Sequence, residues 1–169
     1  DAGVIVMAVG CTYPKEQRHH CEPLYSSSVF CCFNPALLDL PNPVGLDAYV
    51  AAKHAVISQT DSLHGCIKVA LELSGLEIDV VAAAPDFLSV LATARSSAVL
   101  ATVSSRIALR YAPLLGLEIS PVPVALNFPP VAMVWALQTD ADAGAVWLRQ
   151  QIRGAMGRTV DGEVPVTAA

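Results

Sequence analysis

Hydrophobic positions follow two different periods along this chain, and each period predicts one kind of element. Short continuous apolar runs, such as GVIVMAVG at 3–10, are typical of strands buried on both faces. Apolar residues three and four positions apart, as at Leu63, Ile67 and Leu71, indicate helices, and Gly75 stands where a left-handed residue would end one. The predicted strands lie at 3–10, 54–58, 78–84, 98–103 and 129–138, and the predicted helices at 46–52, 63–74, 86–94, 105–111 and 139–155.

The remaining segments are extended or irregular. PLYSSSVFCCF at 23–33 and LEISPVPVAL at 117–126 are expected to be extended, and 11–20 to be a loop. The proline-rich stretch from Asn34 to Gly45 is expected to be a connection, and a possible hinge between lobes. Strands that alternate with helices of about ten residues predict βαβ units, hence an α/β fold with a parallel sheet.

The last helix and the chain end carry two more expectations. Thr139 or Asp140 is expected to cap this helix, with Arg149 and Arg153 toward the negative end of its dipole. Its apolar stripe is predicted to contain Val146, Trp147 and Ile152. Residues 157–169 lack periodicity and are expected to be a disordered tail.

Charge and hydropathy narrow the function classes. The net charge of −5, from 10 basic and 15 acidic residues without a basic run, argues against direct contact with nucleic acid. Although 54% of residues are hydrophobic, no apolar stretch reaches the roughly 18 residues of a membrane span, so no membrane partner is expected. The chain shows no signal-peptide pattern and begins at Asp1 without Met, so we expect a fragment of a longer protein.

Cysteine and histidine residues were considered as metal or redox sites. Five cysteines, two of them adjacent at 31 and 32, fit reduced cytosolic thiols better than a disulfide framework. Cys21 or the Cys31–Cys32 pair could be reactive, but burial as small hydrophobic residues is the favoured reading. His19, His20 and Cys21 lack the spacing that structural zinc requires. No metal and no cofactor are expected.

Catalytic motifs are missing from the sequence. It contains no GxSxG, P-loop, GxGxxG or HExxH pattern. His54 and His64 flank Ser58 and Asp61, but a strand of roughly 3.3 Å per residue puts His54 about 13 Å from Ser58. We therefore expect no catalytic residue and no enzyme.

Several stretches, taken in their order, resemble the effector-binding domain of LysR-type transcriptional regulators. The resemblance covers about residues 1 to 156. It is carried by PLYSSSVFCCFNPALL, LDAYVAAKHAVIS, VVAAAPDFLSVLATARSSAVLATVSSRIALRYAP and PPVAMVWALQTDADAGAVWLRQQI. Asn34-Pro35 and Trp135-Ala136 stand where the family usually has His-Pro and often has Trp-His.

The resemblance implies a two-lobed fold of the periplasmic-binding-protein type (type II), with lobe I incomplete. Residues 1–34 and 126–156 would form the partial lobe I, and residues 35–125 lobe II. The winged helix-turn-helix of the family and the opening strand-helix-strand of lobe I are not in this sequence. DNA binding is therefore expected only through an N-terminal domain outside this chain.

The family's effector loop falls on the polar stretch that follows the strand at 54–58. Hydroxyl and N–H groups beside a helix N-terminus can hold a carboxylate, so Ser58, Gln59, Thr60 and Ser62 are candidate effector-binding residues. The alternative is that Thr60, Asp61 or Ser62 only caps the next helix. Asp61 would repel an acid, so we expect it to be the cap.

Three further candidates follow the next two strands. Asp86 and Phe87 come after the strand at 78–84, and Phe87 could stack on an aromatic effector or be an ordinary core residue. Ser104 begins a later helix and could bind the effector or cap that helix.

The resemblance implies a small-molecule sensor. A co-inducer, acidic or aromatic, would bind between the lobes and control DNA binding through a population shift. The family implies a cytoplasmic homodimer or tetramer. The alternatives are a periplasmic-type solute-binding protein, which shares the fold, and a small hydrolase.

Overall fold

The computed structural model describes residues 6–11, 18–26, 28–58, 66–126 and 130–157. The chain divides into two compact units. Unit 1 comprises Asp1–Ser26 and Pro129–Ala169, and unit 2 comprises Ser27–Phe128. The expected lobe boundaries at residues 34 and 126 stay a prediction.

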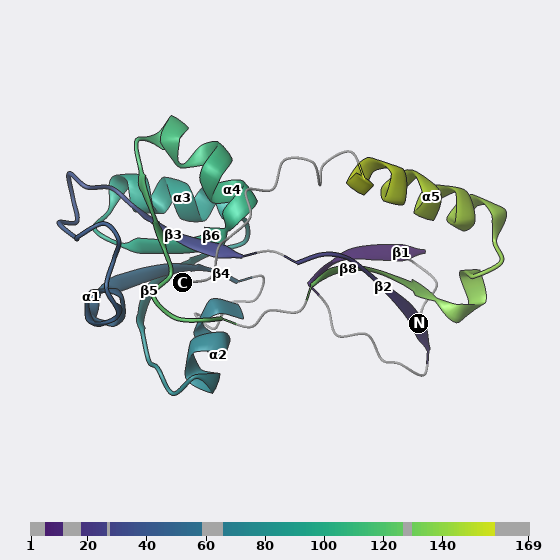
Figure 1. Cartoon of the computed structure of the whole chain (residues 1–169), viewed down its shortest axis with the longest axis horizontal. Helices are drawn as coiled ribbons and strands as arrows, with labels where there is room; N and C mark the ends of the chain where they lie inside the picture. Colours follow the sequence, from purple (N-terminus) through teal and green to yellow (C-terminus); the bar gives the residue numbers. More distant parts are fainter. Residues whose placement is uncertain (1–5, 12–17, 27, 59–65, 127–129, 158–169) are drawn as a thin grey trace. The chain divides into compact units, whose positions relative to one another are not determined.

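Unit 2 is built on a five-stranded mixed sheet, of which Figure 1 labels β3, β4, β5 and β6. The strands follow the order β5-β4-β6-β3-β7. β4 is parallel to both β5 and β6, whereas β3 is antiparallel to β6 and to β7. The bounds are β3 Val29–Phe33, β4 Lys53–Ile57, β5 Asp79–Ala84, β6 Leu100–Ser104 and β7 Glu118–Pro121. The predicted parallel βαβ units are present, but in a sheet extended by two antiparallel strands.

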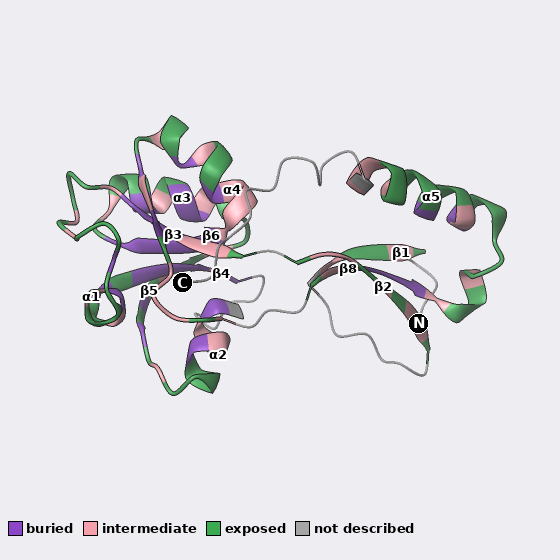
Figure 2. Ribbon diagram, in the orientation of Figure 1, coloured by how far each residue is buried: buried purple, intermediate pink, exposed green. Residues whose placement is uncertain are grey.

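Helices cover both faces of this sheet and enclose two apolar cores. One core includes Tyr49 of α1 and Leu71 of α2, and the other includes Leu91 of α3 and Ala108 of α4. Figure 2 shows the buried inner faces of these elements. The bounds are α1 Leu46–Ala51, α2 Cys66–Leu73, α3 Phe87–Ser96, α4 Ser105–Tyr111 and the 3-10 turn η1 Pro113–Leu115.

Unit 1 contains an antiparallel sheet and the last helix. Its strand order is β1-β8-β2, with β1 Met7–Cys11, β2 His19–Tyr25 and β8 Val131–Ala136. The 3-10 turn η2, Leu137–Thr139, and the helix α5, Ala143–Gly157, follow β8. Neither of the two apolar core clusters found in the described residues lies in unit 1.

Several local predictions are confirmed. Gly75 has φ +75°, and the N–H of Leu76 donates to the carbonyl oxygen of Leu71 at 3.0 Å, which closes α2 with a left-handed residue. The helices predicted at 86–94 and 105–111 are α3 and α4. Residues 63–65 of the helix predicted at 63–74, and 158–169 of the predicted tail, lie outside the described residues.

The prediction of the start of the last helix was wrong. Asp142 caps α5, because its Oδ1 accepts from the N–H of Ala145 at 2.8 Å. Thr139 instead donates its hydroxyl to the carbonyl oxygen of Ala136. Asp140 accepts from the indole N–H of Trp135. The cap lies two or three residues beyond the predicted positions because η2 extends the turn after β8.

Two other expectations in unit 1 are corrected. β2 begins at His19, inside the loop predicted at 11–20. Trp147, placed in the apolar stripe of α5, is 60% exposed, whereas Arg149 is buried at 5%. Arg149 therefore lies on the inner face of α5 rather than serving the helix dipole in solvent.

No helix in the described ranges is long and apolar enough to cross a bilayer.

Candidate functional site

The candidate site is one edge of the five-stranded sheet. Neighbouring parallel strands end at the same edge, and polar residues follow these ends in α/β proteins that bind small ligands. β4, β5 and β6 are such neighbours. Ser58 follows β4, Asp86 follows β5, and Ser104 is the last residue of β6. The sheet order therefore places Ser58 on the strand between the other two.

Ser58 and Ser104 come from neighbouring strands. β4 and β6 pair in parallel at His54–Leu100 and Ala55–Ala101. The N–H of Ser58 donates to the carbonyl oxygen of Ala84 at 3.0 Å, which joins the ends of β4 and β5. Ser58 is 8% exposed. Ser104 is partly buried and precedes α4, but its side chain makes no capping hydrogen bond to that helix.

Asp86 caps the helix α3. Its Oδ1 accepts from the N–H of Ser89 at 2.9 Å and its Oδ2 from the Ser89 hydroxyl at 2.7 Å. The hydrogen bond from the Ser89 N–H, followed by that from its hydroxyl, lowers the pKa of the Asp86 carboxyl. The Asp86 carboxylate already occupies the N-terminus of α3, so this helix end does not provide a binding site for an anion.

Phe87 is not a core residue. It is 38% exposed, whereas the same helix buries Val90, Leu91 and Ala94. An exposed ring at the first position of α3, directly after Asp86, is accessible to a flat ligand. Its role in stacking stays a prediction.

The other candidate residues of the effector loop, Gln59, Thr60 and Ser62, lie outside the described residues, as does Asp61, the expected cap.

Sequence reasoning missed one contributor to this edge. The N–H of Ser105 donates to the carbonyl oxygen of Ser28 at 2.9 Å, and Val29 pairs with Ser104. The amino end of the antiparallel strand β3 therefore meets the carboxyl end of β6. Three consecutive serines before VFCCF were the available signal, but the pattern of a strand does not reveal its direction in a sheet.

Two of the described cysteines, Cys31 and Cys32, behave as the expected buried hydrophobic residues. Cys31 and Cys32 are fully buried in β3. Burial raises the pKa of the Cys31 thiol to about 11 and that of Cys32 to about 12, so both stay protonated at neutral pH. Cys21 is exposed. Among the described residues, no three His, Cys, Asp or Glu side chains form a group that could hold a metal ion.

The chain is similar to transcriptional regulators over most of its length. The LysR substrate binding domain model matches residues 2–157. The HTH-type transcriptional activator NagR of a Ralstonia species is 24% identical over 89% of this chain and 50% of NagR. The HTH-type transcriptional regulator SyrM of Rhizobium meliloti (strain 1021) is 31% identical over 78% of this chain and 41% of SyrM.

A solved structure gives the same result for the fold. The regulatory domain of MexT, a transcriptional activator of Pseudomonas aeruginosa, superposes with a TM-score of 0.76 at 25% identity. The match covers 90% of this chain and 74% of the MexT chain.

These matches define a regulatory domain with the type II periplasmic-binding-protein-like fold. The chain belongs to the LysR substrate binding domain family. The curated relatives are transcriptional regulators, so a periplasmic solute-binding protein is not favoured. The chain spans about half the length of the curated relatives it matches.

Proposed function

We propose that this chain is the effector-sensing part of a LysR-type transcriptional regulator and binds a small co-inducer without chemical turnover. The observation that supports the proposal is that three neighbouring parallel strands end at one edge of the sheet, where Ser58 follows β4, Ser104 ends β6 and Phe87 begins the helix after β5. Hydroxyl groups and an exposed aromatic ring at such an edge suit recognition of a small polar ring compound.

The charge at this edge favours one orientation of the ligand. Asp86 is ionised at neutral pH and would repel a carboxylate placed beside it. An aromatic acid would therefore direct its ring toward Phe87 and its carboxylate toward Ser58 and Ser104, which can donate hydrogen bonds. Gln59, Thr60 and Ser62 are proposed as further contacts of the same ligand.

The rest of the regulator is proposed from the family. DNA would be bound by an N-terminal domain outside this chain, since the net charge of −5 does not suit contact with phosphates. A homodimer or tetramer in the cytoplasm would couple the effector to DNA. The effector acts only if it binds one arrangement of the regulator more tightly than another.

A thermal-shift screen with aromatic acids, their neutral amides and short-chain acids tests the ligand class. We expect aromatic acids to stabilise the chain most. Phe87→Ala should weaken binding of the best compound by about tenfold or less, the effect of losing a single stacking contact of about 0.5–1.5 kcal/mol. Ser104→Ala should weaken binding at least as much, because one hydrogen bond to a charged group contributes about 1.5–3 kcal/mol.

Each of these two variants has a matched control. Leu88→Ala removes a neighbouring side chain that is 49% exposed, and Ser74→Ala removes an exposed serine hydroxyl of unit 2 that bonds the carbonyl oxygen of Ala70. Both should bind the compound like the unchanged chain. Equal loss in Phe87→Ala and Leu88→Ala, or no loss in Phe87→Ala and Ser104→Ala, would reject this edge as the site.

A further inference from the structure

The helix α5 is attached to unit 1 in an unusual way. It is 15 residues long, yet only Ala145 and Arg149 are buried among its described side chains. By contrast, the 10-residue helix α3 buries Val90, Leu91 and Ala94 against the sheet of unit 2. Helices in proteins gain most of their stability from an apolar inner face, and α5 presents an arginine at the centre of that face.

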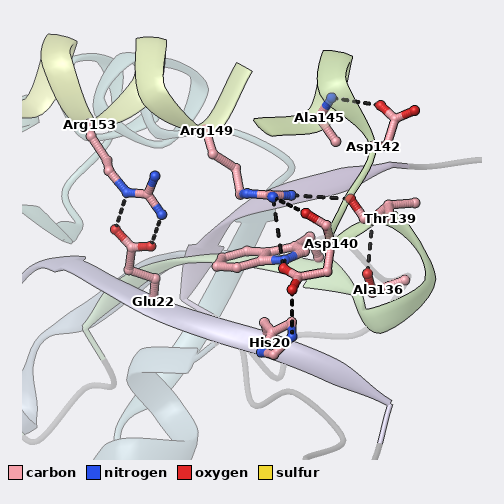
Figure 3. A network of polar contacts seen from close by, with 10 residues as sticks. His20, Glu22, Ala136, Thr139, Asp140, Asp142, Ala145, Arg149 and Arg153 are labelled. Atoms are coloured by element: carbon pink, nitrogen blue, oxygen red, sulfur yellow. Dashed lines mark hydrogen bonds and ion pairs between the residues drawn. The ribbon is translucent and has the colours of Figure 1, made fainter. Parts of the chain in front are cut away.

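Arg149 joins α5 to β8 and to the turn after it (Figure 3). Its guanidinium carbon lies 4.7 Å from the centre of the Trp135 ring. Its Nη2 donates to the carbonyl oxygen of Asp140 at 2.6 Å, and its Nη1 to that of Thr139 at 3.4 Å. The cation is therefore bound by a π face and by backbone oxygens.

Asp140 and His20 complete a cluster of polar and aromatic side chains around Trp135 and Arg149. The Trp135 indole N–H donates to Oδ1 of Asp140 at 2.9 Å, and Nε2 of His20 lies 3.6 Å from Oδ2. The His20 ring centre is 5.4 Å from that of Trp135. Since His20 is in β2 and Trp135 in β8, the cluster ties two strands to α5 through Arg149.

Arg153 makes the second attachment, one turn further along α5. Its Nε donates to Oε1 of Glu22 at 2.7 Å and its Nη2 to Oε2, so the pair is bidentate. Both side chains are partly exposed, Arg153 at 45% and Glu22 at 32%. An ion pair in such contact with water is weakened by salt.

We propose that Arg149 and Arg153 form an electrostatic latch, and that α5 detaches from the three-stranded sheet as a unit while unit 2 stays folded. Elements with few buried apolar contacts open at lower free energy than apolar cores do. Salt weakens the partly exposed Arg153–Glu22 pair of this latch but leaves the two cores of unit 2 intact. The latch lies outside the proposed effector site and does not depend on it.

Hydrogen exchange of the whole chain tests the latch. Raising salt from about 0.05 M to about 0.5 M should speed the exchange of α5 amides several-fold, with little change in α3 and β6. Glu22→Gln, which removes one charge of the Arg153 pair, should speed α5 exchange at low salt and reduce the effect of salt. Glu72→Gln is the matched control, since Glu72 pairs with Lys68 at 3.9 Å within α2.

Fluorescence provides an independent readout. The chain has two tryptophans, so Trp147→Phe, which changes an exposed side chain, leaves Trp135 as the reporter. Acrylamide quenching of Trp135 should rise with salt in parallel with α5 exchange. If Glu22→Gln does not fold, Arg153→Lys, which loses the bidentate geometry, is measured in its place.

Three results would overturn the latch. The first is α5 exchange that does not change with salt, and the second is equal exchange in Glu22→Gln and Glu72→Gln. The third is exchange of α3 and β6 that rises together with α5, which would mean global unfolding.

Discussion

His54 shows how one side chain links burial to pH. It is 1% exposed, and its Nε2 lies 2.7 Å from the carbonyl oxygen of Tyr49, which can only accept, so Nε2 carries the proton. The ring also meets Tyr49 edge to face at 4.8 Å. Burial lowers the pKa of His54, against smaller opposing effects of the Tyr49 hydrogen bond and of Asp79. The folded chain therefore holds a neutral imidazole in its core.

The free energy of unfolding should consequently fall in mild acid. Since the folded pKa lies below the unfolded value of 6.5, the unfolded chain binds the proton first. Stability from this group is complete above about pH 6.5 and decreases toward the folded pKa, by up to about 1.4 kcal/mol per pH unit.

Urea unfolding between about pH 7.5 and about pH 5 measures this dependence. His54→Gln should flatten the profile over this range. A profile that is unchanged in His54→Gln would assign the pH dependence to other groups.

At the scale of single residues, the sequence predicted burial where a local apolar pattern determined it and missed burial that depends on distant contacts. The expectation that Cys31 and Cys32 are buried thiols is confirmed, because an apolar strand pattern dominates their position. The burial of Arg149 was not predicted, because arginine normally lies in solvent and its burial depends on contacts with Trp135 and with the carbonyl oxygens of Thr139 and Asp140. Contacts between residues distant in sequence leave no local pattern to read.

At the scale of elements, the helix ends show which structural features depend on the local sequence and which depend on neighbouring elements. Asp86 caps α3 through the next turn of its own helix, and the sequence predicted that start. The cap of α5 was misplaced because η2 continues the turn after β8 for three residues. The start of a helix can be predicted from sequence when the preceding strand leads directly into the helix. It is harder to predict when another turn lies between the strand and the helix.

Replacing Asp86 should destabilise unit 2 by a predictable amount. Asp86→Ala removes the acceptor of two hydrogen bonds at the first turn of α3, which typically costs about 1 kcal/mol in the free energy of unfolding. Urea unfolding measures the loss. Asp39→Ala, which changes an exposed carboxylate in the 34–45 connection, should stay within about 0.5 kcal/mol of the unchanged chain. An equal loss in both variants would argue against the cap.

At the scale of the whole molecule, the two units differ in how they are stabilised. Unit 2 contains both apolar clusters, on either side of its sheet. The buried residues described in unit 1 come mainly from one strand, β8, and its helix is attached through arginines. Unit 2 is also one continuous segment of chain, from Ser27 to Phe128. These features indicate that unit 2 is the more autonomous of the two.

A fragment of residues 27–128 should therefore fold alone. We expect one cooperative thermal transition and a circular dichroism spectrum with the helix and strand content of unit 2, because both cores are complete within it. The matching test on the full chain is an unfolding curve followed separately by exchange in unit 1 and unit 2. A fragment that melts without a cooperative transition would show that unit 2 needs the rest of the chain.

The sequence by itself determined the alternation of helices and strands from α1 to α4, the left-handed Gly75 and the family resemblance. All of these depend on local periodicity or on the order of motifs. Only the tertiary structure decided that β3 runs antiparallel to β6 and so brings Ser28 to the same edge as Ser104. The burial of Arg149 under α5 was decided in the same way. The physical reason is that strand direction and helix seating are set by pairing between distant segments, which the hydrophobic pattern of each segment does not encode.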